Sequence, residues 1–180
     1  SNFLENTSYY VQIAATAFDD SSSNSYEGIS DKTTLSFVTA DETAPTISSF
    51  SPADNATAVA TTSNIVINFS EAVDVETGNI VIYKSSDDSV VETIDVTSSQ
   101  VTGTGSTQIT INPSSDLAES TSYYVQIDAT AFDDSSSNSY AGISDKTSLS
   151  FTTADETSPT ITGPSGSEAG ASTSTVSVNE

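Results

Sequence analysis

The sequence predicts an all-β sandwich built in tandem repeats, and two observations support that prediction. Apolar residues alternate with polar ones in short runs rich in Ile, Val, Tyr and Phe, which is the period-2 pattern of half-buried strands. Residues 1–47 align with residues 115–161 at a constant offset of 114, with 38 of 47 positions identical. The chain contains no Cys, so such a fold has no disulfides to stabilise it.

The repeat divides the chain into three parts. Residues 42–155 hold one complete copy of the 114-residue period, and residues 1–41 match its C-terminal part. Residues 1–41 are therefore expected to be the C-terminal part of a preceding repeat. Residues 156–180 begin like residues 42–47 and then diverge after Ile161, so we expect a following β module of a different type.

Within residues 42–155 the expected strands are separated by turn signals and number about seven. Residues 45–50 come first, as a broken edge strand that Pro52 ends. The other six are marked by alternating apolar residues, in order Ile65, Ile67 and Phe69; Ile80 and Ile82; Ile94 and Val96; Ile109 and Ile111; Tyr123, Val125 and Ile127; and Leu149 and Phe151.

One spacing is more specific than alternation. Leu117, Thr121 and Tyr123 precede Val125 and Ile127 as in the tyrosine corner of β-sandwiches, where a Tyr at the start of the sixth strand bonds to backbone just upstream. The alternative is that Tyr123 is simply a core aromatic. Both interpretations give the same order of strands.

Four segments of the sequence carry a family resemblance: Asp41-Glu42-Thr43-Ala44-Pro45, Phe50-Ser51-Pro52-Ala53-Asp54, Phe69-Ser70-Glu71-Ala72-Val73, and Phe132-Asp133-Asp134 followed by Asn138, Tyr140 and Gly142. They resemble bacterial Ig-like domains, of the kind found in S-layer proteins and in giant repetitive surface proteins and adhesins. The resemblance covers residues 1–161 and implies an immunoglobulin-like sandwich located on the cell surface or secreted.

The charge balance excludes several classes of function. There are 25 acidic residues and 3 basic ones, which gives a formal charge of −22. Such a chain repels nucleic acid and anionic membranes, and it has no apolar run long enough to insert into a bilayer. It also lacks His and Cys, and all three bases are Lys, so no catalytic constellation assembles. The chain is therefore predicted not to be an enzyme.

A calcium site is expected at one pole of the sandwich. In sandwiches of the type this chain resembles, the loops after the second and sixth strands lie at the end where the chain arrives, and related surface arrays bind calcium at their linkers and become stiff. Calcium takes six to eight oxygen ligands, which acidic loops supply. The expected ligands are Asp41, Glu42, Glu71, Asp74, Asp133, Asp134 and Asn138, with the repeat equivalents Asp19, Asp20 and Asn24.

The loop after the sixth strand also allows a narrower interpretation. Asp134, Ser136, Asn138, Tyr140 and Asp145 stand at positions 1, 3, 5, 7 and 12 of an EF-hand-like spacing, but Ser139 occupies the place where that motif needs Gly. The alternative is an Asx-type turn between two strands. The sequence leaves both open.

The predicted function is an extracellular spacer segment of a large repetitive bacterial surface protein, stiffened by calcium at its domain junctions. Its expected partners are neighbouring Ig-like domains of the same chain. A glycan- or protein-binding module is an alternative, in which exposed Tyr83, Tyr124 and Tyr140 stack on sugars. A further alternative is a subunit of a surface lattice or filament, in which incomplete end domains of like chains complete each other.

Overall fold

The computed structural model describes residues 2–162 and 177–179. Its regular elements are all strands. They are β1 (Ser8–Tyr10), β2 (Ser36–Val38), β3 (Ile47–Ser51), β4 (Ala56–Val59), β5 (Ile65–Val75), β6 (Asn79–Lys84), β7 (Val90–Asp95), β8 (Val101–Thr102), β9 (Ser106–Ile111), β10 (Ser122–Ile127), β11 (Phe132–Asp133), β12 (Ser150–Thr153), β13 (Thr160–Thr162) and β14 (Ser177–Asn179). In this described part of the chain, no helix is long and apolar enough to cross a membrane.

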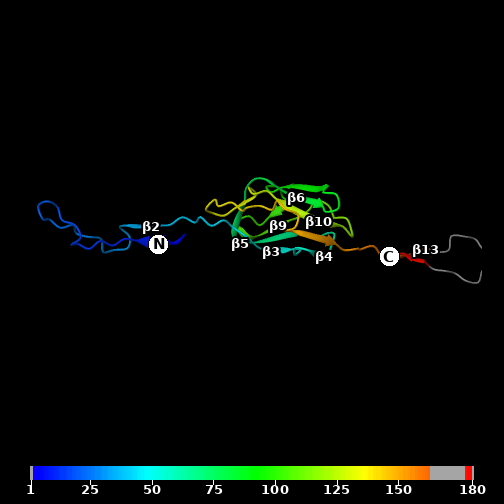
Figure 1. Ribbon diagram of the computed structural model, residues 1–180, viewed down its shortest axis with the longest axis horizontal. Coiled ribbons are helices and arrows are strands. Elements are labelled where there is room, and N and C mark those ends of the chain that lie inside the picture. Colours follow the sequence, from blue (N-terminus) through cyan, green and yellow to red (C-terminus); the bar gives the residue numbers. More distant parts are fainter. Residues whose placement is uncertain (1, 163–176, 180) are drawn as a thin grey trace, which may run out of the picture.

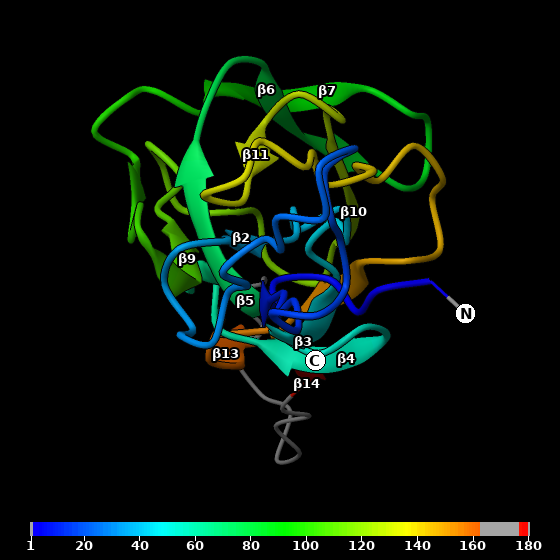
Figure 2. The same ribbon diagram turned by 90° about the vertical axis from the view of Figure 1, so that its left-hand side faces the viewer.

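Strands β3 to β12 form a two-layered sandwich, which Figure 2 shows end-on. One sheet has the order β4-β12-β10-β6-β7, and the other has the order β11-β5-β9-β8 with β3 added along β5. All pairs are antiparallel except β12 with β4, which run parallel. The predicted all-β sandwich is confirmed.

The seven expected strands are all present, as β3, β5, β6, β7, β9, β10 and β12. Three additional strands, β4, β8 and β11, are two to four residues long and carry no alternating apolar run, so the sequence gives no sign of them. One boundary was wrong. The alternating apolar residues marked the second predicted strand only as far as Phe69, whereas β5 continues to Val75. Its pairing with β9 shifts register after Asn68, and its last residues pair with β11.

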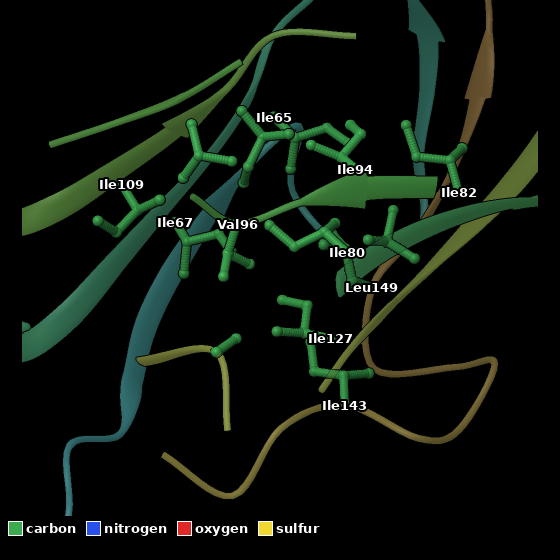
Figure 3. Packing of buried hydrophobic residues seen from close by; sticks show 14 of the residues in the cluster. Ile65, Ile67, Ile80, Ile82, Ile94, Val96, Ile109, Ile127, Ile143 and Leu149 are labelled. Atoms are coloured by element: carbon green, nitrogen blue, oxygen red, sulfur yellow. The ribbon is translucent and has the colours of Figure 1, made fainter. Parts of the chain in front are cut away.

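The core lies between the two sheets and is built mainly from Ile and Val (Figure 3). Ile65 and Ile67 of β5 and Ile109 of β9 come from one sheet, and Ile80 and Ile82 of β6 come from the other. Full burial of each such side chain contributes about 1.5–3 kcal/mol to folding. The alternation seen in the sequence therefore identifies the inward-facing positions correctly.

Tyr123 forms the predicted tyrosine corner. Its hydroxyl oxygen accepts a hydrogen bond from the backbone N–H of Ala118 at 2.9 Å, while the ring is buried in the core against Phe151. The two interpretations of Tyr123 are thus both correct. The bond ties the chain just before β10 to the strand itself.

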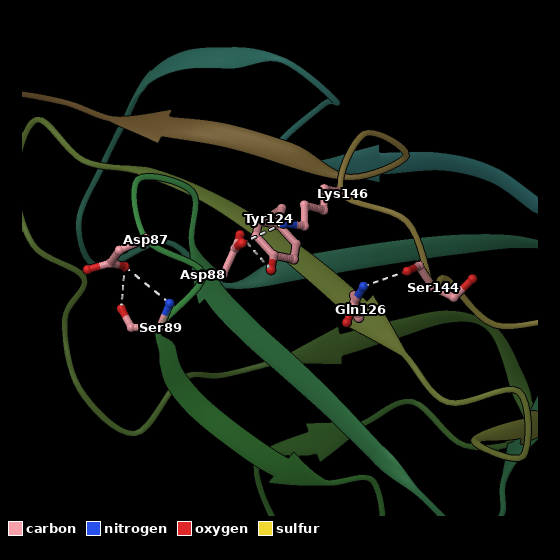
Figure 4. A network of polar contacts seen from close by, with 7 residues as sticks. All are labelled: Asp87, Asp88, Ser89, Tyr124, Gln126, Ser144 and Lys146. Atoms are coloured by element: carbon pink, nitrogen blue, oxygen red, sulfur yellow. Dashed lines mark hydrogen bonds and ion pairs between the residues drawn. The ribbon is translucent and has the colours of Figure 1, made fainter.

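The expectation of exposed aromatic side chains at Tyr124 and Tyr140 was wrong, because both residues are buried. Tyr124 stacks on Tyr83 with ring centroids 4.8 Å apart, and the Lys146 ammonium lies 5.6 Å over its ring. Figure 4 shows Asp88 beside both Tyr124 and Lys146, where its carboxylate accepts hydrogen bonds from the Lys146 ammonium at 2.6 Å and the Tyr124 hydroxyl at 3.2 Å. These contacts cover the ring face that sugar stacking requires.

Residues 2–40 extend from one end of the sandwich, and the chain leaves at the other end (Figure 1). In residues 2–40, β1 pairs with β2 in the register that β10 forms with β12, offset by 114. Beyond the sandwich, β13 pairs with β14. Of the module predicted from residue 156 onward, residues 163–176 and 180 lie outside the described residues.

Candidate metal centre

Glu71 lies in the inward-facing row of β5. Alternate residues along a strand share one face, and Phe69 and Val73, two positions on either side, are both buried. An apolar residue is expected at such a position, yet Glu71 places a half-buried carboxylate there. That carboxylate accepts no hydrogen bond from the described residues, and none of their cations pairs with it.

Asp134 is held beside β5 by the turn that follows β11. Its Oδ1 accepts the backbone N–H groups of Ser136 and Asn138, both at 2.8 Å, and its Oδ2 accepts the Asn138 side-chain amide at 2.8 Å. Asp134 is buried, with 5% of its surface exposed. The sequence Asp-Ser-Ser-Ser-Asn makes this turn because a short carboxylate can cap the following amides.

Asp41 comes from the linker between residues 2–40 and the sandwich. The side-chain amide of Asn138 donates to the backbone carbonyl of Asp41 at 3.1 Å, so it bridges the linker and Asp134. Pro45, four residues later, is buried, and Thr46 N–H donates to the Ser70 hydroxyl at 3.0 Å beside Glu71. The linker is thus fastened to the pole of the sandwich.

The carboxylates of Asp41, Glu71 and Asp134 converge, with one oxygen from each within 4.8 Å of the others. Burial raises the pKa of Glu71, and the charges of Asp134 and Asp41 raise it further. Burial also tends to raise the pKa of Asp134, but its hydrogen bonds from Asn138 and Ser136 outweigh that effect and lower it. The site therefore holds negative charge that no cation of the described residues balances.

The donor set fits a hard divalent cation. Three carboxylates supply up to six oxygens, and calcium accepts six to eight oxygen ligands in a flexible geometry. No His or Cys is present in the chain, so the site has no ligand that favours a transition metal. The residues present fit calcium, with Asp41, Glu71 and Asp134 as the candidate ligands.

Comparison with known proteins places this sandwich in a family. Residues 41–153 match the family described as bacterial Ig-like domain. The chain belongs to that family. A crystal structure of the S-layer protein rSbsC is similar at a TM-score of 0.42 and 15% sequence identity, over 67% of this chain and 15% of that chain. No curated protein matches.

Three other predicted ligands of the bacterial Ig-like domain lie outside this group. Glu42 is exposed, and its backbone N–H faces Glu5. Asp74 and Asp133 were expected in loops but lie on β5 and β11, directly opposite each other in the pairing of those strands. Asp74 and Asp133 therefore lie beside the group formed by Asp41, Glu71 and Asp134 and are not part of it.

The repeat equivalents Asp19, Asp20 and Asn24 reproduce only the turn. Asp20 accepts the N–H groups of Ser22 and Asn24 and the Asn24 amide, as Asp134 does with Ser136 and Asn138. The partners of Asp134 in the cluster come from β5 and the incoming linker, and no equivalent of either adjoins Asp20 among the described residues. The repeat in residues 2–40 therefore lacks most of the carboxylates that are the candidate ligands around Asp134.

The loop at residues 134–145 takes the Asx-turn geometry. Asp145, the twelfth residue of the EF-hand-like spacing, uses its Oδ1 to accept the N–H groups of Thr147 and Ser148, so it caps its own turn. With Asp134 and Asp145 each capping the turn that follows it, the spacing reflects two Asx turns.

A linker contact that was not predicted from the sequence occurs in both copies. The Thr43 hydroxyl donates to Glu5 Oε2 at 2.6 Å, and the Thr157 hydroxyl donates to Glu119 Oε2 at 2.5 Å. Both pairs are separated by 38 residues. Each linker is thus anchored to the module before it, and the repeated Glu–Thr spacing is the signal that identifies the contact.

Proposed function

We propose that this chain is an extracellular spacer segment of a repetitive bacterial surface protein, and that calcium stiffens its domain junctions. One observation carries the proposal: the linker carboxylate of Asp41 meets those of Glu71 and Asp134 at the pole of the next module. An ion held by all three would join the linker to the sandwich and remove freedom at the hinge.

The charge of the chain supports the same proposal. A formal charge of −22 destabilises a compact state by self-repulsion, and bound cations relieve it. The Asn138 bridge to the Asp41 carbonyl already positions the linker, so an ion would bind to a partly preorganised site. Membership of the bacterial Ig-like family is consistent with a structural, non-catalytic role on the cell surface.

Thermal unfolding tests the calcium part of the proposal. At calcium ten times its dissociation constant, mass action stabilises the folded state by about 1.4 kcal/mol. We expect the Tm of the 180-residue chain to rise by several degrees in calcium relative to chelator, at matched ionic strength in NaCl. Equal Tm values in calcium and chelator would refute a folded-state calcium site.

Stiffening requires a separate measurement of linker freedom. We expect hydrogen exchange at residues 41–46 to slow in calcium, since bridging Asp41 to Glu71 and Asp134 suppresses opening of the linker. Replacing Asp41 with Asn should abolish that slowing while the sandwich remains folded. Exchange at the linker that is equally fast with and without calcium would leave calcium no role at the junction.

A further inference from the structure

Asp41 begins a short turn in the linker. Its carboxylate oxygen Oδ1 accepts the backbone N–H of Thr43, two residues later, at 3.1 Å. Asp155 forms the same turn where the chain leaves the sandwich, and its Oδ1 accepts the Thr157 N–H at 3.0 Å. Both are Asx turns, in which a short carboxylate caps the backbone that follows it. The direction of the Asp41 side chain is therefore linked to the position of Thr43.

These two linker turns differ from four other Asp-x-Ser/Thr turns in the acceptor of the Ser or Thr hydroxyl. In the four, the hydroxyl donates back to the same Asp Oδ1 that accepts the N–H, at 2.7–2.8 Å. The four turns begin at Asp31, Asp87, Asp95 and Asp145. In the linker turns, the hydroxyl of Thr43 donates instead to Glu5 Oε2, and that of Thr157 donates to Glu119 Oε2. Asp41 and Asp155 thus keep an acceptor position that the other turns fill.

Glu5 and Glu119 occupy equivalent places, three residues before the first residue of β1 and of β10. Their contacts with the linker hydroxyls, at 2.6 and 2.5 Å, have the length of hydrogen bonds to an ionised carboxylate. A hydroxyl has one proton to donate. A hydrogen bond to the Glu therefore withdraws the Thr hydroxyl from the Asp of its own turn.

Asp41 is held from both sides of the linker. The Asn138 amide, on the sandwich side, donates to its backbone carbonyl and leaves the carboxylate free. The Thr43 N–H holds the carboxylate, and Thr43 is itself held by Glu5, on the side of residues 2–40. The Asp41 carboxylate also lies in the cluster with those of Glu71 and Asp134. Glu5 thus acts on a member of that cluster through Thr43.

The exit linker shows how strongly a Glu and a Thr next to the Asp fasten the chain to the module it leaves. Glu156 lies between Asp155 and Thr157, and its carboxylate accepts both the N–H of Thr61 at 3.3 Å and the Thr61 hydroxyl at 2.8 Å. Thr61 is buried in the sandwich, with 8% of its surface exposed. Glu156 and Thr157 both bind back to the sandwich, so the carboxylate of Asp155 is the one left for other partners.

We infer that Glu5 is a positioning residue for the candidate calcium site: it fastens Thr43, keeps the Thr43 hydroxyl off Asp41, and so leaves an Asp41 oxygen free for the ion. This role rests on the proposed function and deepens it. Thr43 binds back to residues 2–40, while Asp41 is presented forward to the sandwich. The same hydrogen bonds recur 114 residues later, so the arrangement belongs to the repeat.

The first test measures linker mobility without calcium. Thr43→Val removes the hydroxyl and leaves the charge unchanged. In chelator, we expect the NMR backbone order parameters of residues 41–43 to fall from about 0.8 to about 0.6 or lower. Thr43→Ser keeps a hydroxyl and should retain the native values. Thr157→Val makes the same change at the other turn, and as the matched control it should leave residues 41–43 rigid.

The second test titrates the full chain with calcium by calorimetry. We expect Thr43→Val to weaken binding about fivefold, the factor that corresponds to one ordinary hydrogen bond. Thr43→Ser and Thr157→Val should bind as the native chain does. Glu5→Ala removes a charge as well as the contact, so its effect is compared in two backgrounds. It should weaken binding about fivefold more in the native chain than in Thr43→Val, which has no contact left to lose.

The outcomes separate this role from the proposed function. A native chain that binds no calcium overturns both. Calcium binding that Thr43→Val leaves unchanged, or that Thr157→Val weakens as much, overturns the role of Glu5 alone. Residues 41–43 that stay as rigid in Thr43→Val as in the native chain overturn it too, as do equal effects of Glu5→Ala in the two backgrounds.

Discussion

At the residue scale, Glu71 shows how a functional position departs from the pattern of its strand. It stands between Phe69 and Val73 in the inward-facing row of β5, where burial and the carboxylates of Asp134 and Asp41 raise its pKa. An ionised Glu71 therefore destabilises the module by itself. Natural sequences tend to keep such a residue where a ligand compensates for it.

Glu71→Gln should separate the two effects of this carboxylate. In chelator we expect the Tm to rise by a few degrees, because the repulsion from Asp134 and Asp41 is removed. In calcium the Tm gain seen with the native chain should be lost. The matched control is Glu76→Gln, an exposed residue about 16 Å further along the extended chain, which should leave the calcium response intact. A full calcium response in Glu71→Gln would rule that residue out as a ligand.

Tyr123 supports a prediction about its hydroxyl alone. Tyr123→Phe keeps the buried ring but removes the acceptor of the Ala118 N–H, so the free energy of unfolding should fall by about 1 kcal/mol. Tyr83→Phe is the control, because the Tyr83 hydroxyl forms no hydrogen bond with the described residues and its ring stacking is retained. Urea denaturation measures both variants. Equal losses in the two would show that the corner adds no stability.

At the element scale, the sequence predicts the elements with a strong apolar period and misses those without one. β5, β6 and β9 follow from alternating Ile residues, since the period-2 pattern marks the inward face. β8 and β11 are two residues long and depend on backbone pairing that only the tertiary fold provides. The end of β5 was predicted too early, because its inward-facing row continues through Glu71. A charged residue in the sequence suggests that a strand has ended and a loop has begun.

The candidate site was predictable in part for the same reason. The resemblance to sandwich topology placed several acidic residues at one pole, and three of them, Asp41, Glu71 and Asp134, do meet there. Strand alternation decides which carboxylate points inward. Asp74 and Asp133 were expected in loops, but they lie opposite each other on paired strands, beside the group. Side-chain direction at a strand end is not contained in the list of acidic residues.

Two glycines with left-handed backbone conformations, one between β8 and β9 and one between β11 and β12, allow a matched test of backbone geometry. Gly142 and Gly105 both have a φ of 77°, but a Cβ at Gly142 would lie 2.6 Å from the Ile127 carbonyl, whereas one at Gly105 meets nothing closer than 3.8 Å. Gly105→Ala should cost about 1–2 kcal/mol from its left-handed conformation alone. Gly142→Ala should cost about 2–5 kcal/mol, because backbone must also move. Similar losses in urea denaturation would show that close approach at Gly142 has no effect.

At the scale of the whole molecule, stability reflects an acidic surface that is balanced by few bases. With three Lys residues, ion pairs are scarce, and Lys146 with Asp88 is the salt bridge of the described residues. Many carboxylates instead cap backbone turns, as Asp134 and Asp145 do. Such caps stabilise the fold when ionised, whereas the summed negative charge opposes it, so the two effects depend on pH in opposite directions.

This opposition predicts the pH dependence of stability in chelator. The pKa of Glu71 is raised in the folded state, so stability grows as the pH falls through that raised pKa, and protonation of other carboxylates also weakens the repulsion. Hydrogen bonds from Ser148 and Thr147 hold the pKa of Asp145 far below its ordinary value. Its contribution is present above the unfolded pKa of about 3.9 and is lost as the pH falls through the lowered folded pKa.

We therefore expect the Tm in chelator to rise from pH 7 to about pH 5 and to fall again below about pH 3, because there the turn carboxylates are protonated in the unfolded chain while the folded turns still hold them ionised. Calcium should raise the Tm more at pH 7 than near pH 5, because the pKa of Glu71 is raised and a protonated Glu71 binds calcium poorly. Glu71→Gln should flatten part of the rise between pH 7 and pH 5. A Tm in chelator that is highest at pH 7 would mean that repulsion among these carboxylates does not limit stability, and that the cluster at Asp41, Glu71 and Asp134 has no need of a cation.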